Sequence, residues 1–265
     1  MYNTVYHQLS CARNDGVKAR IRLVLFGFAG GRIAALMSLA KELPSWIEVW
    51  GAEYPGRGFR WKTHSLNSAQ HLLDDLMPGL RGLCNKPVVL LGYSMGANIA
   101  YRLGLNLSGQ VLGVIAASAP PPSQKVMDLH KYSDQRLLEH LESLGGIPPE
   151  ILSSQAIMDI FLPVVRADLE CCSDMDRLAL QPLNCPILVM HGSADRMVRI
   201  TEAPRWLQIS GGRTDFSLCK VYPGGHFFHQ GVEAKVALDI TNWLLKLLST
   251  TVPASEPAPS SSKNI

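Results

Sequence analysis

Three residues that together can break an acyl bond occur along the chain in the order serine, aspartate, histidine. Ser94 lies between two glycines in the sequence GYSMG, Asp195 follows a short apolar segment, and His226 follows a pair of glycines. In such a set the histidine takes the proton of the serine hydroxyl and later returns it to the leaving group. The carboxylate holds the imidazole in the required tautomer and stabilises its charged form. The sequence therefore predicts nucleophilic catalysis with Ser94 as the nucleophile.

The segment around Ser94 has the pattern of a nucleophile elbow. Residues 88–91 are apolar and predict a buried strand, and residues 97–103 predict the start of a helix. The flanking glycines suit the tight turn between them, where the N–H of Met95 can face a developing oxyanion. A glycine-flanked serine also occurs by chance in ordinary turns. The flanking strand and helix, and the order Ser…Asp…His, favour an α/β-hydrolase.

Other residues compete for the second and third positions of this set. In some proteins of this fold the acid follows an earlier strand, but no acidic residue occurs between position 117 and Asp128. His191 falls at the end of a predicted strand, where we expect it to be packed in the core, and His229 follows His226 by three residues. His226 is preferred because the two glycines before it allow its loop to reach the serine.

The elements that must position these residues alternate between strand and helix. Strands are predicted at 20–26, 46–52, 88–91, 110–117, 186–191 and 217–222, and helices at 33–42, 68–83, 97–103 and 233–248. This alternation predicts an α/β fold with a mostly parallel, doubly wound sheet. Each of the three candidate residues follows a strand, so all three can meet at the carboxyl edge of the sheet.

The segment between about 122 and 180 has no strand pattern. Helical patterns at 133–144, 154–162 and 163–172 predict an insertion that forms a lid over the serine. We expect one domain over residues 1–249, followed by a disordered tail at 250–265 that is rich in serine, proline and alanine.

A glycine-rich loop, Gly27-Phe28-Ala29-Gly30-Gly31, follows the first predicted strand. This is where an α/β-hydrolase places its second oxyanion donor, and we assign it to the Ala29 N–H, with Phe28 as the near alternative. A phosphate-binding loop would require G-x-G-x-x-G, which is absent here. A basic and aromatic stretch at 57–62 is equally compatible with a solvated loop and with a binding surface.

Composition excludes several other classes of protein. The chain has 265 residues and a net charge of +3, which is too small to indicate a nucleic-acid partner. No apolar run is long enough to span a membrane, and the N-terminus lacks the apolar core of a signal peptide. The six cysteines have no C-x-x-C spacing, so we expect reduced thiols in a cytoplasmic protein and no metal site.

Over about residues 20–248 the chain resembles the type II thioesterases of nonribosomal peptide and polyketide synthesis. The motifs that carry the resemblance are the loops at 28–31 and 55–58, the elbow, the segments LGGIPPE at 144–150 and LPVVRAD at 162–168, Asp195, and PGGHFF at 223–228. The elbow is common to many hydrolases, whereas the two segments of the insertion and the last motif are more specific.

The resemblance implies a hydrolase that removes stalled acyl groups from the phosphopantetheine arm of carrier domains, or releases intermediates, in antibiotic biosynthesis. It implies no cofactor beyond the phosphopantetheine of the substrate, and we expect a monomer. It also implies contacts of Phe28, Arg57, Tyr93 and Phe227 with the substrate or the carrier. Tyr93 departs from the family, which usually has histidine before the nucleophile, and this leaves the substrate preference open.

Two other classes of function use the same fold. A small-molecule carboxylesterase or lipase would use the same three residues, and a binding protein of this fold would lack a reactive serine.

A basic rim of loop residues would steer an acidic carrier domain to the mouth of the site. We assign to it Arg57, Arg60, Lys62, Arg199 and Arg205.

Overall fold

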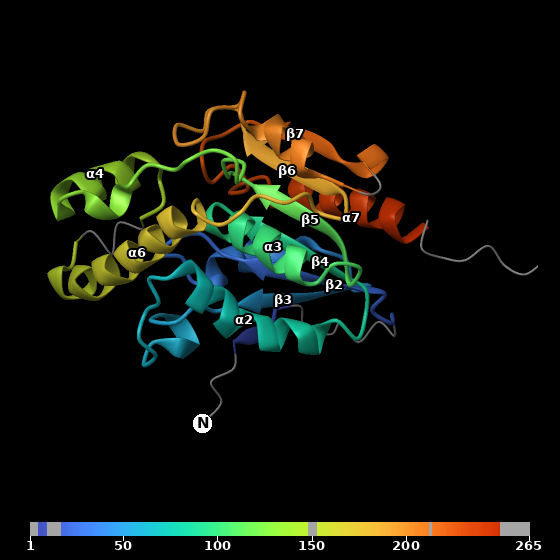
Figure 1. Ribbon diagram of the computed structural model, residues 1–265, viewed down its shortest axis with the longest axis horizontal. Helices are drawn as coiled ribbons and strands as arrows, with labels where there is room; N and C mark the ends of the chain where they lie inside the picture. Colours follow the sequence, from blue (N-terminus) through green and yellow to red (C-terminus); the bar gives the residue numbers. More distant parts are fainter. Residues whose placement is uncertain (1–4, 10–16, 148–152, 212–213, 250–265) are drawn as a thin grey trace, which may run out of the picture.

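A seven-stranded sheet forms the centre of the computed structural model, which describes residues 5–9, 17–147, 153–211 and 214–249 (Figure 1). In sheet order the strands are β1 (Tyr6–Gln8), β3 (Ile47–Ala52), β2 (Ile21–Phe26), β4 (Val88–Tyr93), β5 (Val111–Ala117), β6 (Ile187–Gly192) and β7 (Leu218–Tyr222). Strand β1 pairs with β3 in antiparallel orientation, and the other strand pairs are parallel. The mostly parallel sheet expected from the sequence is confirmed, whereas β1 is too short for its pattern to have predicted it.

Helices cover both faces of this sheet. Helices α2 (Ala69–Leu83) and α3 (Met95–Asn106) pack on one face, and α1 (Met37–Glu42) and α7 (Glu233–Ser249) pack on the other. Side chains of β2 alternate between the faces: Val24 and Phe26 join the first core, and Leu23 and Leu25 join the second. The central strands are therefore apolar at nearly every position, as is typical of parallel sheets.

Short 3₁₀ helices connect several of these elements. They are η1 (Ile33–Leu36), η2 (Gly58–Arg60), η3 (Leu129–Lys131), η4 (Ala203–Ile209) and η5 (Thr214–Phe216). The helix predicted at 33–42 is thus a 3₁₀ turn that continues into α1.

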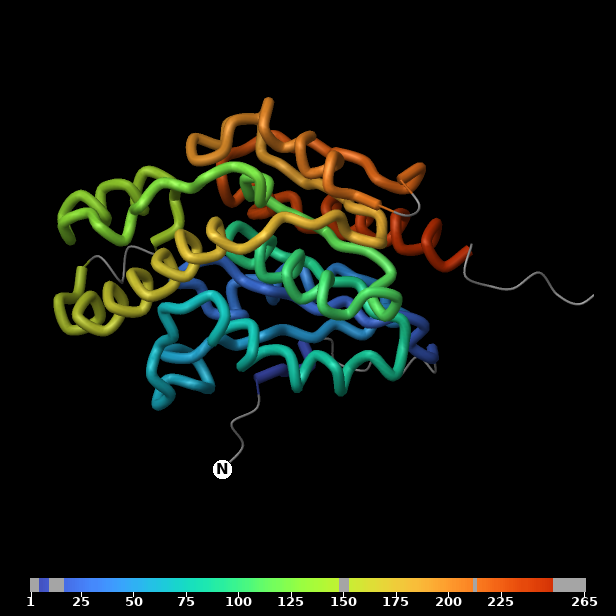
Figure 2. The backbone as a smooth tube through the Cα atoms, in the orientation of Figure 1, coloured from blue at the N-terminus to red at the C-terminus, as the bar shows by residue number. Residues whose placement is uncertain are grey.

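Two further helices lie at the end of the sheet toward which the parallel strands point. Helix α4 (Asp134–Ser143) and helix α6 (Gln155–Met175) project beyond the strand ends, and the backbone trace shows α6 beside the loop that precedes α2 (Figures 1 and 2). The sequence predicted a break at Pro163, but α6 runs through it. Pro163 is exposed and its neighbours Val164 and Val165 are buried, so tertiary packing holds the helix together despite the missing N–H.

The tail predicted to be disordered lies outside the described residues, as do residues 148–150 of the LGGIPPE motif. Within the described part of the chain, no helix combines the length and the apolar character that crossing a bilayer requires.

Candidate active site

The turn that carries Ser94 is sterically strained. Ser94 has φ 55° and ψ −117°, a conformation that non-glycine residues rarely adopt. A Cβ atom at Gly92 would lie 2.0 Å from the carbonyl oxygen of Gly96, and a Cβ atom at Gly96 would lie 2.1 Å from that of Phe26. Both glycines are therefore required by close backbone contacts, which hold the serine between β4 and α3.

The three residues predicted from their order in the chain lie together at the carboxyl edge of the sheet. Ser94 follows β4, Asp195 follows β6, and His226 follows β7. The Nε2 atom of His226 lies 3.1 Å from Oγ of Ser94, and its Nδ1 atom lies 2.9 Å from Oδ2 of Asp195. Both distances are those of hydrogen bonds. Loops distant in sequence thus form a continuous chain from carboxylate to hydroxyl.

Asp195 is held in its charged form. Its side chain is fully buried, and its Oδ1 atom accepts hydrogen bonds from the backbone N–H groups of Met197 at 2.8 Å and Val198 at 3.1 Å. Burial by itself raises the pKa of this carboxyl, but the hydrogen bonds from His226 and from the two N–H groups outweigh it and lower the pKa. A charged Asp195 accepts Nδ1–H of His226 and leaves Nε2 free to take the serine proton.

The two residues expected to supply oxyanion N–H groups lie around one cavity. Met95 is the first residue of α3, and Ala29 belongs to the loop after β2; both line the same cavity as Ser94. The Ala29 loop is fixed from the insertion, because Oδ2 of Asp168 on α6 accepts the next N–H along, that of Gly30, at 2.7 Å. The same carboxylate forms a two-pronged ion pair with Arg57, in which Nη2 lies 2.6 Å from Oδ1.

A cavity of about 280 Å³ opens onto Ser94 and His226. Its walls come from the Phe28–Ala29 loop, the segment 120–129, helices α4 and α6, and the loop of His226. Most of the wall is apolar; Phe28 and Phe227, which were expected to contact substrate, both line it and touch edge to face with ring centres 4.8 Å apart. The cavity therefore offers an acyl group an apolar chamber directly beside the nucleophile.

Two other residues expected to bind substrate or carrier are not placed to do so. Tyr93 is 1% exposed and its hydroxyl donates to the carbonyl of His226 at 2.6 Å. Arg57 is 6% exposed because its guanidinium is used by Asp168. Arg60, assigned to a basic rim, is also buried and pairs with Asp75. In the structure each of these three side chains is buried and bonded within the protein.

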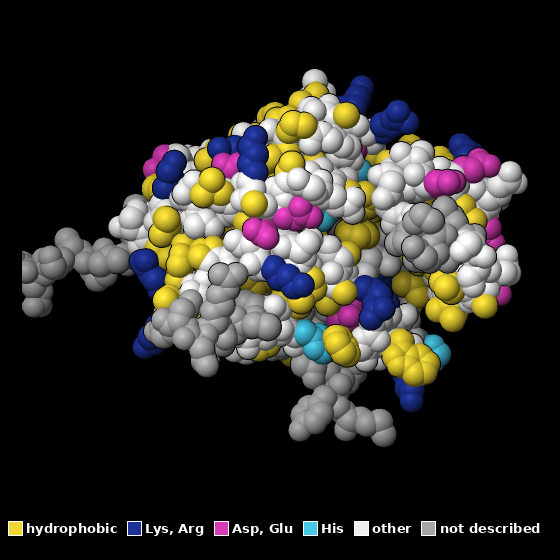
Figure 3. Space-filling model, turned by 180° about the vertical axis from the view of Figure 1, so that it is seen from behind, with side chains coloured by type: hydrophobic (Ala, Val, Ile, Leu, Met, Phe, Trp, Pro, Cys, Tyr) yellow, Lys and Arg dark blue, Asp and Glu magenta, His cyan; other side chains and the backbone are white. Residues whose placement is uncertain are grey.

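The charges that remain exposed are distributed over the surface. Lys62, Arg199 and Arg205 keep exposed or part-exposed side chains, although the two arginines lie near Glu202. On the face shown in Figure 3, basic and acidic side chains are interspersed.

The two rival histidines are core residues. His191 and His229 are each 1% exposed, and Nε2 of His191 lies 3.0 Å from the carbonyl oxygen of Val198. Burial lowers the pKa of both imidazoles. Packing of His191 in the core was expected, and the structure confirms it.

Sequence reasoning missed several residues around the nucleophile. Asn98 and Gln124 line the chamber, and Asp168 holds the loop that contains Ala29 and Gly30. Asn98 could have been found, because it lies in the first turn of the helix that begins directly after Ser94. Gln124 lies in a loop and Asp168 bonds a residue 138 positions away, so no local pattern indicates either contact.

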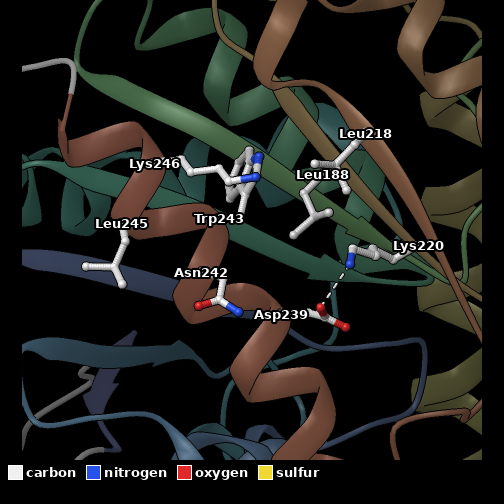
Figure 4. Close-up of a pocket in the computed structure, with 8 residues that line it drawn as sticks. All are labelled: Leu188, Leu218, Lys220, Asp239, Asn242, Trp243, Leu245 and Lys246. Atoms are coloured by element: carbon white, nitrogen blue, oxygen red, sulfur yellow. Dashed lines mark hydrogen bonds and ion pairs between the residues drawn. The ribbon is translucent and has the colours of Figure 1, made fainter.

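A second cavity, of about 360 Å³, lies between α7 and strands β6 and β7 (Figure 4). Its polar side chains include Lys220 and Asp239, which form an ion pair at 3.0 Å. Its lining holds no nucleophile beside a base, and we assign it no chemistry. No group of three or more potential metal-ligating side chains occurs among the described residues.

Comparison with known proteins agrees with this geometry. A family model described as "Thioesterase domain" matches residues 21–243. The gramicidin S biosynthesis protein GrsT of Aneurinibacillus migulanus is 31% identical over 221 residues, which are 81% of this chain and 85% of GrsT.

Solved structures of similar proteins have the same fold. The thioesterase RedJ of the prodiginine pathway in Streptomyces coelicolor superposes with a TM-score of 0.76 at 27% identity, covering 85% of this chain and 86% of RedJ. The type II thioesterase YbtT of the yersiniabactin pathway superposes with a TM-score of 0.80 at 25% identity, covering 92% of this chain and 99% of YbtT.

Proposed function

The chain belongs to the thioesterase domain family, and we propose that it is a type II thioesterase that releases acyl groups from the phosphopantetheine arm of carrier domains. The similar proteins named above act in gramicidin S, prodiginine and yersiniabactin biosynthesis, which supports a role in nonribosomal peptide or polyketide synthesis. The observation that carries the proposal is the hydrogen-bonded chain Asp195–His226–Ser94 beside an apolar chamber.

In the proposed mechanism Ser94 Oγ attacks the thioester carbonyl while Nε2 of His226 takes its proton. The N–H groups of Met95 and Ala29 stabilise the oxyanion of the tetrahedral intermediate. His226 then returns the proton as the carbon–sulfur bond breaks, so that the carrier leaves as a free thiol and the acyl group stays on the serine. A water activated by His226 hydrolyses this ester, releasing the carboxylic acid and restoring the serine hydroxyl. No cofactor takes part in these steps.

The proposal is tested with one acyl group presented in three forms: on a carrier domain, on free pantetheine, and as a simple ester. The carrier form should have the highest kcat/KM. Its advantage should shrink at high salt if Lys62, Arg199 and Arg205 contribute to docking, because salt screens exposed charges. Equal kcat/KM for all three forms would identify a general carboxylesterase instead.

The role of Ser94 is tested separately. Ser94→Ala should lower turnover by several orders of magnitude, because only binding and oxyanion effects remain when a triad nucleophile is lost. Near wild-type turnover in this variant would contradict the mechanism.

A further inference from the structure

The acyl chamber is not uniformly apolar. Two carboxamides, those of Asn98 and Gln124, belong to its lining and come from different elements. The Oε1 atom of Gln124 is buried and has no hydrogen-bond partner among the described residues. A buried polar atom without a partner is costly, and such an atom in a ligand chamber indicates a group that the ligand would satisfy.

Asn98 places the second carboxamide near the reacting carbon. It lies in the first turn of α3, four residues after Ser94, and it lines the same chamber as Ser94 and His226. Its carboxamide is therefore within the chamber that an acyl group attached to Ser94 would enter. Lys125 also lines the chamber but is exposed, so its charge stays in solvent.

From these positions we infer that the acyl group carries a hydroxyl group a few bonds from the thioester, bound by Asn98 and Gln124, with its O–H donating to Oε1 of Gln124. The inference rests on the proposed thioesterase function. The chamber limits the rest of the chain: apolar cavities of about 150 Å³ hold benzene, so 280 Å³ accommodates a chain of medium length.

The test compares octanoyl, 3-hydroxyoctanoyl and 3-oxooctanoyl thioesters of N-acetylcysteamine with the full chain. The wild-type protein should favour the 3-hydroxyoctanoyl thioester over the other two about tenfold in kcat/KM, because neither the plain nor the 3-oxo chain has a donor for Oε1 of Gln124. Asn98→Leu and Gln124→Leu should each reduce this ratio toward one. Asn106→Leu, an exposed site on the same helix outside the chamber, is the matched control and should keep the ratio.

The outcomes distinguish the inference from the proposed function on which it rests. Efficient hydrolysis of all three thioesters with equal kcat/KM, or a ratio that neither leucine variant changes, would overturn the inference and leave the thioesterase function intact. Hydrolysis of none of them, on N-acetylcysteamine or on a carrier domain, would contradict the thioesterase function itself.

A second and independent observation concerns the backbone of His226. The hydroxyl of Tyr93 donates a hydrogen bond to the carbonyl of His226 at 2.6 Å. The same hydroxyl accepts a hydrogen bond from Oγ of Ser118 at 3.4 Å. Both side chains are buried, and Ser118 adopts φ 45°, which is strained for a residue with a side chain. Strain of this kind persists where the surrounding structure requires it and is frequent at functional sites.

The geometry points to Tyr93 and Ser118 as positioning residues that fix the loop of the catalytic histidine. The aromatic ring of Tyr93 packs against Phe227 and Phe228 and so holds the loop by contact. The hydroxyl of Tyr93 fixes the position of the His226 backbone through its hydrogen bond. Because His226 must stay within hydrogen-bond reach of Ser94, a small shift of its backbone lowers the rate of proton transfer.

Tyr93→Phe removes the hydroxyl and keeps the ring, so it should lower kcat about tenfold with KM changed by less than twofold. Ser118→Gly deletes the second hydroxyl and tolerates φ 45°. The double variant should lose little more than Tyr93→Phe alone, because the two hydroxyls act in series. Tyr6→Phe is the matched control: its buried hydroxyl bonds the Leu76 carbonyl at 3.0 Å, away from the site.

Tyr6→Phe should lower Tm as much as Tyr93→Phe but leave kcat unchanged. The positioning role would be overturned by an unchanged kcat in Tyr93→Phe, or by equal losses of kcat in the two tyrosine variants. Fully additive losses in the double variant would overturn the series arrangement of Tyr93 and Ser118.

Discussion

Variants at Asp168 can distinguish an effect on the stability of the fold from an effect on catalysis. Its carboxylate is 3% exposed and accepts hydrogen bonds from Arg57 on the loop before η2 and from the N–H of Gly30, beside the expected oxyanion donor Ala29. One side chain of α6 thus joins the insertion, the loop of Arg57 and the loop of Ala29 and Gly30. The perturbation to make is Asp168→Ala.

The structure allows the size of this effect to be estimated. Removing one partner of a buried ion pair leaves a buried charge unpaired and costs about 3–5 kcal/mol of unfolding free energy. The total free energy of unfolding of a domain is about 5–15 kcal/mol, so the Asp168→Ala variant should still fold but be much less stable. Losing the anchor on Gly30 also releases the Ala29 N–H. Loss of one oxyanion donor lowers kcat by about 10²–10³, which sets the upper limit for this effect.

The assay combines urea unfolding with kcat on an acyl thioester, measured for three variants. Asp168→Ala should lose both stability and turnover. Arg57→Met/Asp168→Leu removes both charges, so it should recover much of the stability but not the turnover. Asp75→Asn breaks a comparable ion pair with the buried Arg60 and should lose stability alone.

The result that would refute this reasoning is a double variant with kcat within about threefold of wild type. The Arg57–Asp168 pair would then only stabilise the fold, and the position of the Ala29 loop would depend on other contacts. A loss of turnover in Asp75→Asn equal to that in Asp168→Ala would likewise show that any destabilisation impairs the site.

Three further predictions address the remaining parts of the site. Asp195→Asn should lower kcat by about 10⁴ without unfolding the protein, because it favours the wrong imidazole tautomer; a larger kcat loss in Asp168→Asn than in Asp195→Asn would contradict the assignment. Unfolding free energy should fall as pH drops below about 6.5, because burial lowers the pKa of His191 and His229 from 6.5, so the unfolded chain binds more protons. Urea titrations from pH 8 to 5 measure this, and His191→Gln should make the unfolding free energy depend less steeply on pH. A urea midpoint that does not change with pH in the wild-type protein would contradict the prediction. Amide exchange should be faster in α4, which buries one side chain, than in α2, which buries six, whereas equal rates would argue against a mobile lid.

Much of the fold was predictable because it depends on local patterns. Apolar runs fixed the strands from β2 to β7, and the order Ser…Asp…His together with glycine at 92 and 96 indicated the elbow. The burial of Tyr93 was also accessible in principle. It lies two residues after Leu91 in β4, and side chains two apart in a strand share a face, here the one packed on α7.

Other features exist only in the folded chain. Arg57 carries no local sign of its partner, because Asp168 is 111 residues away and the two meet only when α6 packs beside the loop after β3. Gln124 and Asn98 face one chamber because a loop and a helix converge there. Pro163 predicts a helix end, yet buried contacts on both sides keep α6 continuous. Sequence patterns set which face of each element is buried, whereas the pairing of distant polar groups is decided by how the elements pack.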